Sequence, residues 1–367
     1  MPWTKLQADA SSGKWYPSSE KDIRILTYRE ALKEAQLQAL QTDPDVFIMG
    51  EGVDDPGGIF GTTKDLHKRF GNDRVFDLPL SENGFTGIAV GAAIAGARPI
   101  LVHMRMDFLL LAADQIINHA AKWRYMFGSA QHVPLTIRAI IGRGWGSGAQ
   151  HSQSLQGTFL NTPGLKIVMP SNAYDAKGLL LASIADPDPV LFIEHRWLYD
   201  HKDRVPAEVY TIPIGKADIK RKGRDVTIVA TSYMVWESIQ AAEQLYSDDG
   251  IDVEIVDLRS INPMDESLVF DSVKKTGRLI IADTGCKKGG ISGEIAAEIS
   301  EKLFSDLKAP VKRIALPDTP TPASHVLEEA YYSGQKEICE AVKETMRDRR
   351  IIDRPMGHQL KRGMAVL

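Results

Sequence analysis

Short apolar runs alternate with longer helix-like segments along most of the chain, and this alternation limits the possible folds more than any other feature. The runs that predict strands fall at residues 46–49, 75–76, 99–103, 133–141, 165–169, 190–194, 226–230, 253–257, 279–282 and 311–315. Alternating strands and helices are typical of mainly parallel sheets that carry helices on both faces. The sequence therefore predicts an α/β fold with two doubly wound domains, the second smaller than the first.

Charge and pattern mark the limits of these two domains. The apolar pattern weakens between residues 199 and 224, where charged residues concentrate, and the strand–helix alternation then resumes. A chain of 367 residues with 43% hydrophobic content is long enough for two cores, since single cores stop growing near ~250–300 residues. We predict an irregular N-terminal arm at 1–22, a first domain at 23–205, a second at 206–346 and a basic tail at 347–367.

The composition excludes several classes of protein. A formal net charge of −4 gives no basis for nucleic acid as a partner. No apolar run reaches the ~18–20 residues that cross a bilayer, and the N-terminus has no apolar signal core. The only cysteines, Cys286 and Cys339, lack the CxxC spacing of metal or redox pairs. We therefore expect a soluble, cytoplasmic protein without a membrane partner.

A helix is predicted at 82–95, with Ser81 as its N-cap. Gly84, Gly87 and Gly91 recur in it at spacings of three and four, so one face carries almost no side chains. Each such glycine costs roughly 0.5–1 kcal/mol relative to alanine, which indicates that another helix or a ligand lies against this backbone. The other helices are predicted at 27–41 with Thr27 as N-cap, 63–70, 109–126, 171–185 with Ser171 as N-cap, 235–246, 265–275, 293–304 and 335–346.

Glu82 stands at the start of the glycine-rich helix, among small and apolar residues. A carboxyl group held in dry surroundings has a raised pKa and can donate a proton. The alternative is that Glu82 only caps its own helix, because acidic residues favour first turns.

Three further candidates follow predicted strands. Glu51 comes directly after one strand, Phe108 follows another, and His151 lies in the glycine-rich loop GRGWGSGAQHSQS after a third. Ligands of open α/β sheets bind at the carboxyl ends of the strands, and an aromatic side chain such as Phe108 can stack on a flat ring. The loop itself lacks the helix and acid of a nicotinamide site, and no GxSxG elbow supports a Ser–His hydrolase.

Several long motifs resemble one family. LPLSENGFTGIAVGAAIAGARP, DFLLLAADQIINHAAKWRYMFG, GAQHSQS and NTPGLKIVMPSNAYDAKGLL occur in this order. Together they are similar to the beta subunits of thiamine-diphosphate-dependent 2-oxo acid dehydrogenases, which belong to the transketolase-like superfamily and act on pyruvate, acetoin or branched-chain substrates. The resemblance covers about residues 25–346 and implies a pyrimidine-binding first domain and a transketolase-type second domain.

The resemblance implies a role for each candidate residue. Glu82 matches the glutamate that shares a proton with ring nitrogen N1′ of the cofactor, which makes the 4′-amino group able to deprotonate the thiazolium C2. Phe108 matches the aromatic residue against the pyrimidine. His151 matches the histidine near C2 that positions the substrate or the lipoyl group, and Glu51 matches an acid beside the cofactor.

The family also implies partners and ions. No Gly-Asp-Gly occurs in the chain, although relatives hold the diphosphate through magnesium with a GDG motif. We therefore expect an alpha subunit that carries Mg²⁺, an α2β2 tetramer with a beta dimer inside it, and a lipoyl-bearing acyltransferase as the acyl acceptor. Positions that form a structural potassium site in several relatives, mostly through backbone carbonyls, are matched by Leu135, Arg138, Ser183, Asp186 and Asp188.

Two other functions remain open at this stage. One is half of a split transketolase, in which Arg105 and Arg143 would meet a sugar phosphate. The other is a scaffold that keeps the fold without the chemistry, against which Glu82 and His151 speak. Arg105 also departs from the family pattern; it either marks an acidic substrate or points outward.

Overall fold

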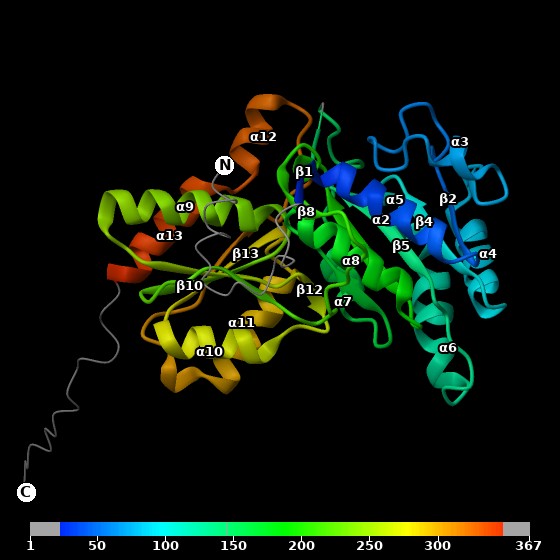
Figure 1. Cartoon of the computed structure of the whole chain (residues 1–367). Coiled ribbons are helices and arrows are strands. Elements are labelled where there is room, and N and C mark those ends of the chain that lie inside the picture. Colours follow the sequence, from blue (N-terminus) through cyan, green and yellow to red (C-terminus); the bar gives the residue numbers. More distant parts are fainter. Residues whose placement is uncertain (1–22, 145, 348–367) are drawn as a thin grey trace, which may run out of the picture.

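The computed structural model describes residues 23–144 and 146–347, so the predicted arm at 1–22 and nearly all of the predicted tail lie outside it. Within this part the chain forms two α/β units that lie side by side (Figure 1). This arrangement confirms the predicted α/β fold with two doubly wound domains.

The first unit is built on a seven-stranded sheet with the strand order β12-β6-β7-β5-β4-β2-β3. All neighbouring strands are parallel except β12, which runs antiparallel to β6. Their bounds are β2 Val46–Gly50, β3 Val75–Asp77, β4 Arg98–His103, β5 Thr136–Ile141, β6 Lys166–Val168, β7 Val190–His195 and β12 Ser260–Asn262. Parallel strands end at one common edge, so this sheet can gather side chains from loops that are far apart in the sequence.

Helices cover both faces of this sheet because its strands are apolar on both sides. Along β4, Ile100 and Val102 belong to one buried cluster, and Leu101 between them belongs to another. Successive side chains of a strand point to opposite faces. The first face is covered by α2 Tyr28–Thr42 and α8 Ala173–Ala185, and the second by α4 Glu82–Ile94 and the segment that follows β4.

The second unit repeats this plan on a five-stranded sheet with the order β14-β13-β10-β11-β9, in which β9 is the antiparallel strand. Its strands are β9 Asp218–Arg221, β10 Val226–Ala230, β11 Val253–Asp257, β13 Leu279–Cys286 and β14 Lys312–Leu316. Helices α9 Tyr233–Asp249 and α13 Gln335–Arg347 pack on one face, and α10 Glu266–Thr276 and α11 Ile291–Lys302 pack on the other. Ile228 faces the first pair and Val229 the second, as the strand periodicity requires.

The predicted caps have different outcomes. Thr27 caps α2 in a capping box with Glu30, as predicted. Ser81 precedes α4, but its side chain makes no capping hydrogen bond. The cap of α8 is Asn172, whose side chain accepts from the backbone N–H of Asp175 at 2.8 Å, so the prediction of Ser171 is wrong. The hydroxyl of Ser171 donates to Asp257 instead.

The prediction of one regular helix at 109–126 is also wrong. The segment consists of α5 Met106–Leu109, the 3₁₀ turn η2 Leu110–Ala112, the π-helical segment η3 Gln115–Ala120 and α6 Ala121–Met126. A π turn re-aims the side chains around it. Here Gln115 turns toward α4, and an alanine Cβ at Gly87 would lie 3.3 Å from its side-chain oxygen.

Several short elements were not predicted. They are β1 Ile23–Thr27 and its antiparallel partner β8 Lys202–Pro206, then β9, β12, α7 Gln156–Leu160, α12 His325–Tyr331 and the 3₁₀ turns η4 Arg196–Leu198 and η5 Phe304–Asp306. The helix predicted at 63–70 forms as the shorter α3 Leu66–Phe70. Residues 260–262 lie in the predicted second domain, yet they form β12 at the edge of the first sheet. No helix in the described ranges is long and apolar enough to cross a membrane.

Candidate active site

The carboxyl edge of the first sheet gathers the predicted site residues. Glu51 follows β2 directly, and Phe108 lies in α5, a few residues beyond β4. His151 comes after the loop that begins at Gly142, the residue next to the end of β5. Because β2, β4 and β5 are parallel neighbours, the three loops meet at the same edge.

Phe108 and His151 are in contact. Their ring centroids lie 5.3 Å apart, with the ring planes at 77° in an edge-to-face arrangement. Asp107 fixes this contact, because its Oδ1 accepts hydrogen bonds from the backbone N–H and the side-chain amide of Gln153, at 3.1 and 2.9 Å. The half-buried ring of Phe108 and the exposed ring of His151 thus form one wall of the candidate site.

The surroundings of Glu51 at this edge change the pKa of its carboxyl group. Its side chain is buried, and its Oε1 has no hydrogen-bond partner in the described part of the chain. Burial, together with the nearby carboxylates of Glu82 and Asp77, raises the pKa of Glu51 to about 7. The structure therefore brings Glu51 and Glu82 together at one site, with one of the two acids able to keep a proton at neutral pH.

Glu82 itself is less buried than the sequence predicts. It opens α4, as predicted, but its side chain is half-exposed in this chain. Dry surroundings for this carboxylate therefore require a cover that the described residues do not supply. The prediction of a buried Glu82 is wrong for the single chain, and the physical reason is the open side of α4.

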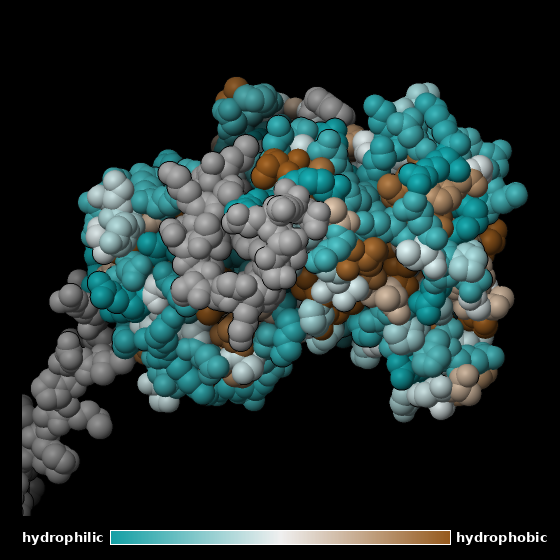
Figure 2. All heavy atoms as spheres, viewed as in Figure 1, coloured by the Kyte–Doolittle hydropathy of each residue, from teal (hydrophilic) through white to brown (hydrophobic). Residues whose placement is uncertain are grey.

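The glycine face of α4 is only partly covered. Gly87 packs against Gln115, but no atom of the described chain lies within 4 Å of a Cβ built at Gly91. Large apolar side chains stand exposed beside this face, including Leu80 at 82% and Ile88 at 64%. Apolar atoms accordingly reach the surface over α4, at the right of the view in Figure 2.

Replacing Glu51 by Gln is expected to change how stability depends on pH. The raised pKa means that the folded chain holds this proton more tightly than the unfolded chain, so wild-type stability falls as the pH rises from about 4.5 to 7. The glutamine variant does not lose this stability. Its free energy of unfolding should therefore rise by roughly 1–3 kcal/mol relative to wild type between pH 5 and pH 8. Urea unfolding at both pH values measures the gain, and the exposed Glu243→Gln is the control; equal pH dependence in all three proteins would refute the assignment.

Arginines hold the glycine-rich loop that leads to His151. Arg105 is buried and donates to the carbonyl oxygen of Gly142 at 3.2 Å, so the alternative that it points outward is wrong. Arg143 lies over the rings of both Trp197 and Tyr332, and the three residues line one small pocket.

Four of the five positions matched to a potassium site lie around one turn. Ser183, Asp186 and Asp188 lie at the end of α8 and in the turn that follows, and the carbonyl oxygen of Leu135 accepts from Val190 next to this turn. The carboxylate of Asp186 accepts from Lys166 at 2.7 Å, and Asp188 pairs with Arg124 at 2.6 Å.

Arg138 lies apart from this turn. It is fully buried in the middle of β5, where its guanidinium pairs with Glu194 and bonds to Gln36 and Thr62. Its side chain therefore has a structural function between the sheet and α2. Among the described residues, no group of three or more His, Cys, Asp or Glu side chains is arranged to hold a metal ion.

Sequence reasoning missed two residues of this site. Asp77 ends β3 and accepts from the backbone N–H groups of Gly52 and Val53, which holds the loop of Glu51 in place. Asp107 orders the loop of His151. Both follow strands at the carboxyl edge, so the rule that selected Glu51 applies to Asp77 and Asp107 as well.

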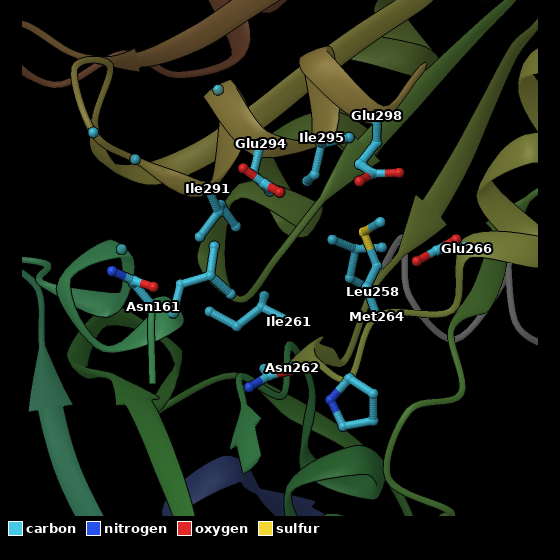
Figure 3. A pocket seen from close by; sticks show the side chains of 16 residues that line it. Asn161, Leu258, Ile261, Asn262, Met264, Glu266, Ile291, Glu294, Ile295 and Glu298 are labelled. Carbon is cyan, nitrogen blue, oxygen red and sulfur yellow. The ribbon is translucent and has the colours of Figure 1, made fainter. Parts of the chain in front are cut away.

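A separate cavity of about 700 Å³ lies between α7, α11 and residues 258–266. Ile261, Ile291 and Ile295 point into it, with Glu294 and Glu298 along one side (Figure 3). None of the predicted site residues lines it.

Comparison with known proteins gives the family. Residues 25–202 match the transketolase pyrimidine-binding domain, and residues 215–338 match the transketolase C-terminal domain. The acetoin:2,6-dichlorophenolindophenol oxidoreductase subunit beta of Bacillus subtilis is 46% identical over 88% of this chain and 98% of its own length. The 2-oxoisovalerate dehydrogenase subunit beta of the same organism is 42% identical, covering 88% and 99%.

Two further comparisons agree. The pyruvate dehydrogenase E1 component subunit beta of Gracilaria tenuistipitata is 45% identical over 86% of this chain and 97% of its own length. A solved structure described as a split gene transketolase, inactive beta4 tetramer, has a TM-score of 0.73 at 22% identity, covering 89% and 99%, which shows the shared fold. The chain belongs to the thiamine-diphosphate-dependent family of 2-oxo acid dehydrogenase beta subunits, which is built from transketolase-type domains.

Proposed function

We propose that this chain is the beta subunit of a 2-oxo acid dehydrogenase that oxidatively decarboxylates a 2-oxo acid and transfers the acyl group to a lipoyl-bearing acyltransferase. The observation that supports the proposal is that Glu51 lies near Glu82 and Phe108 contacts His151, both pairs at the carboxyl edge of the first sheet. Relatives at 42–46% identity are named as beta subunits of acetoin, 2-oxoisovalerate and pyruvate enzymes.

The residues at this edge suit the aminopyrimidine ring of thiamine diphosphate. The unpartnered, buried Oε1 of Glu51 and the half-exposed Glu82 offer carboxyl groups to ring nitrogens, and Phe108 offers an aromatic edge. When bound, thiamine diphosphate supplies a carbon nucleophile for attack on a keto carbon. Glu82 would hold a proton against ring nitrogen N1′, and Phe108 would pack on the ring.

His151 would act on the substrate side of the same site. Its ring is exposed and is held edge-on against Phe108, on the loop that Asp107 ties down. A histidine so placed can exchange a proton with a reacting oxygen or sulfur at neutral pH. We therefore assign His151 to positioning the substrate or the incoming lipoyl group.

The open face of α4 supports an alpha subunit as the missing cover. Gly91 and the exposed Ile88 and Leu111 give α4 and the turn η2 an apolar surface, and no side chain of the described chain packs on Gly91. Such patches mark protein interfaces. The alpha subunit would bury Glu82, hold the diphosphate through Mg²⁺, and complete an α2β2 tetramer that contains a beta dimer.

A structural potassium ion stays part of the proposal only for the backbone around Leu135 and residues 183–188.

Two free cysteines in the described chain are consistent with work in a reducing cytoplasm. The names of the relatives at 42–46% identity favour the proposed function over the split-transketolase alternative.

Co-purification with a candidate alpha subunit tests the proposal. The complex is then assayed with pyruvate, branched-chain 2-oxo acids and acetoin, with an artificial electron acceptor, and with sugar phosphates as the competing class. Turnover of a 2-oxo acid supports the proposal, and turnover of acetoin alone or of sugar phosphates alone contradicts the proposed decarboxylation.

Replacing Ile88 by Glu should weaken this complex at least about tenfold, because a charge would be buried without a partner in an apolar interface. The free chain should unfold like wild type, since this side chain is 64% exposed. Affinity for the alpha subunit is measured by surface plasmon resonance, with Phe304→Glu, at a site that is 78% exposed in the second unit, as the control. Equal loss in both variants would place the interface elsewhere.

A further inference from the structure

The loop between β5 and His151 has little conformational restraint of its own. Gly142, Gly146 and Gly148 have φ values of +94°, +67° and +66°, a region that favours glycine. Three such residues in one loop leave the unfolded chain many conformations, so a fixed loop needs external contacts. The contacts that fix this one come from both units.

Arg143 makes the most extensive of these contacts. Its guanidinium carbon lies 4.3 Å from the ring centroid of Trp197 and 4.5 Å from that of Tyr332. One nitrogen lies 3.7 Å from the carboxylate of Glu328, whose side chain is only 6% exposed. A cation that contacts two aromatic rings and pairs with a buried acid is held more strongly than in a surface ion pair.

These partners come from both halves of the chain. Trp197 lies in η4, just after β7 of the first sheet, whereas Glu328 lies in α12 and Tyr332 directly follows that helix. The loop also rests on the segment before α12: a Cβ at Gly146 would lie 3.0 Å from the carbonyl oxygen of Ala323, two residues before the helix begins. The glycine-rich loop is therefore packed between the first unit and α12.

The far end of the same segment is tied to the first unit. Gln153 donates twice to Asp107, and His151 contacts Phe108 edge-to-face. Arg143 and Gln153 are thus the two anchors of the segment that carries His151. Without the first anchor, the loop would keep the hydrogen bond from Arg105 to Gly142, the bonds from Ser147 to Gly144 within the loop, and packing.

We propose that Arg143 is the positioning residue for His151, and that it couples α12 of the second domain to the active site. This inference rests on the proposed function, because it assigns the purpose of the anchor to the placement of His151. It also gives Trp197 and Tyr332 a shared purpose, which is to hold a guanidinium of the same chain.

Hydrogen exchange on the full chain tests the anchor without any activity assay. In Arg143→Met, deuterium uptake of peptides that cover residues 142–151 should become about tenfold faster. Arg143→Lys keeps a cation over the rings and should stay within about threefold of wild type. Arg224→Met, on a side chain that is 81% exposed, is the matched control and should not change the uptake. Unchanged uptake in Arg143→Met overturns the proposal.

Kinetics of the complex with the alpha subunit test whether Arg143 positions His151 for catalysis. Arg143→Met should lower kcat about tenfold with KM changed less than about twofold, and Arg143→Lys should restore most of kcat. Equal kcat in wild type and Arg143→Met, or a defect that lysine does not rescue, overturns the positioning function. If Arg143→Met does not fold, Tyr332→Leu, which removes one ring face, replaces it with the same expected directions.

The two hypotheses fail in different ways. A wild-type complex that turns over none of the tested substrates, combined with faster exchange in Arg143→Met, contradicts the proposed function and supports the anchor. An active wild-type complex with no change in exchange contradicts the anchor alone.

Discussion

Replacing Glu82 by Gln is expected to lower kcat of the reconstituted complex by roughly 10²–10⁴-fold, the usual range for loss of an acid–base group. Glutamine has nearly the same size and can still form a hydrogen bond, but it cannot share a carboxyl proton with a ring nitrogen. Glu82 stands at the start of α4 with Glu51 beside it, and burial together with the nearby carboxylates raises the pKa of Glu51 to about 7.

Steady-state turnover with the best substrate measures this effect, and the exposed Glu301→Gln is the control for the same change elsewhere. The free Glu82→Gln chain should unfold at the same urea concentration as wild type, because Glu82 is half-exposed. Turnover within twofold of wild type would favour the scaffold hypothesis, in which the fold is kept without its chemistry.

Replacing Asp175 by Asn is expected to destabilise the folded chain by roughly 3–5 kcal/mol, the range for breaking a buried ion pair from one side. Asp175 lies in α8, is fully buried, and accepts from Lys220 of β9 and from Arg259, both at 2.7 Å. The change would leave two buried cations of the second unit with less compensating charge.

The pH dependence of this network has a definite sign. Burial opposes the charged form, but Arg259 and Lys220 outweigh it and hold the pKa of Asp175 well below its usual range. Its stabilising contribution is therefore complete above about pH 4 and is lost as the pH falls further. Urea unfolding at neutral pH measures the main effect, and Asp271→Asn on an exposed face of α10 is the control. A loss below about 1 kcal/mol would show that the network is not an ion-pair link between the units.

Most of the sheet structure could be predicted because it depends on local pattern. The apolar runs that became β2, β4, β10 and β11 are buried on both faces, so each carries its own signal. Strands β1, β8 and β12 are short and pair only with segments far away in the sequence. Their formation depends on tertiary contacts, and no apolar periodicity in these segments predicts a strand.

The candidate site shows the same limit. That Glu51, Phe108 and His151 meet at one edge follows from the rule for parallel sheets. The burial of each acid does not follow from this rule, because it depends on neighbours such as Asp77 and on the open side of α4. The contact of Arg143 with Trp197 and Tyr332 joins three distant segments and could not be predicted from spacing.

One measurement tests most directly whether two chains share the cofactor site. It is calorimetric titration of thiamine diphosphate with Mg²⁺ into this chain alone, into the alpha subunit alone and into their complex. We expect saturable binding and turnover only in the complex, because the acid of α4 and the diphosphate-binding groups lie on different chains. Tight binding by this chain alone, with 2-oxo acid turnover of about 1 s⁻¹ or more, would contradict the shared site.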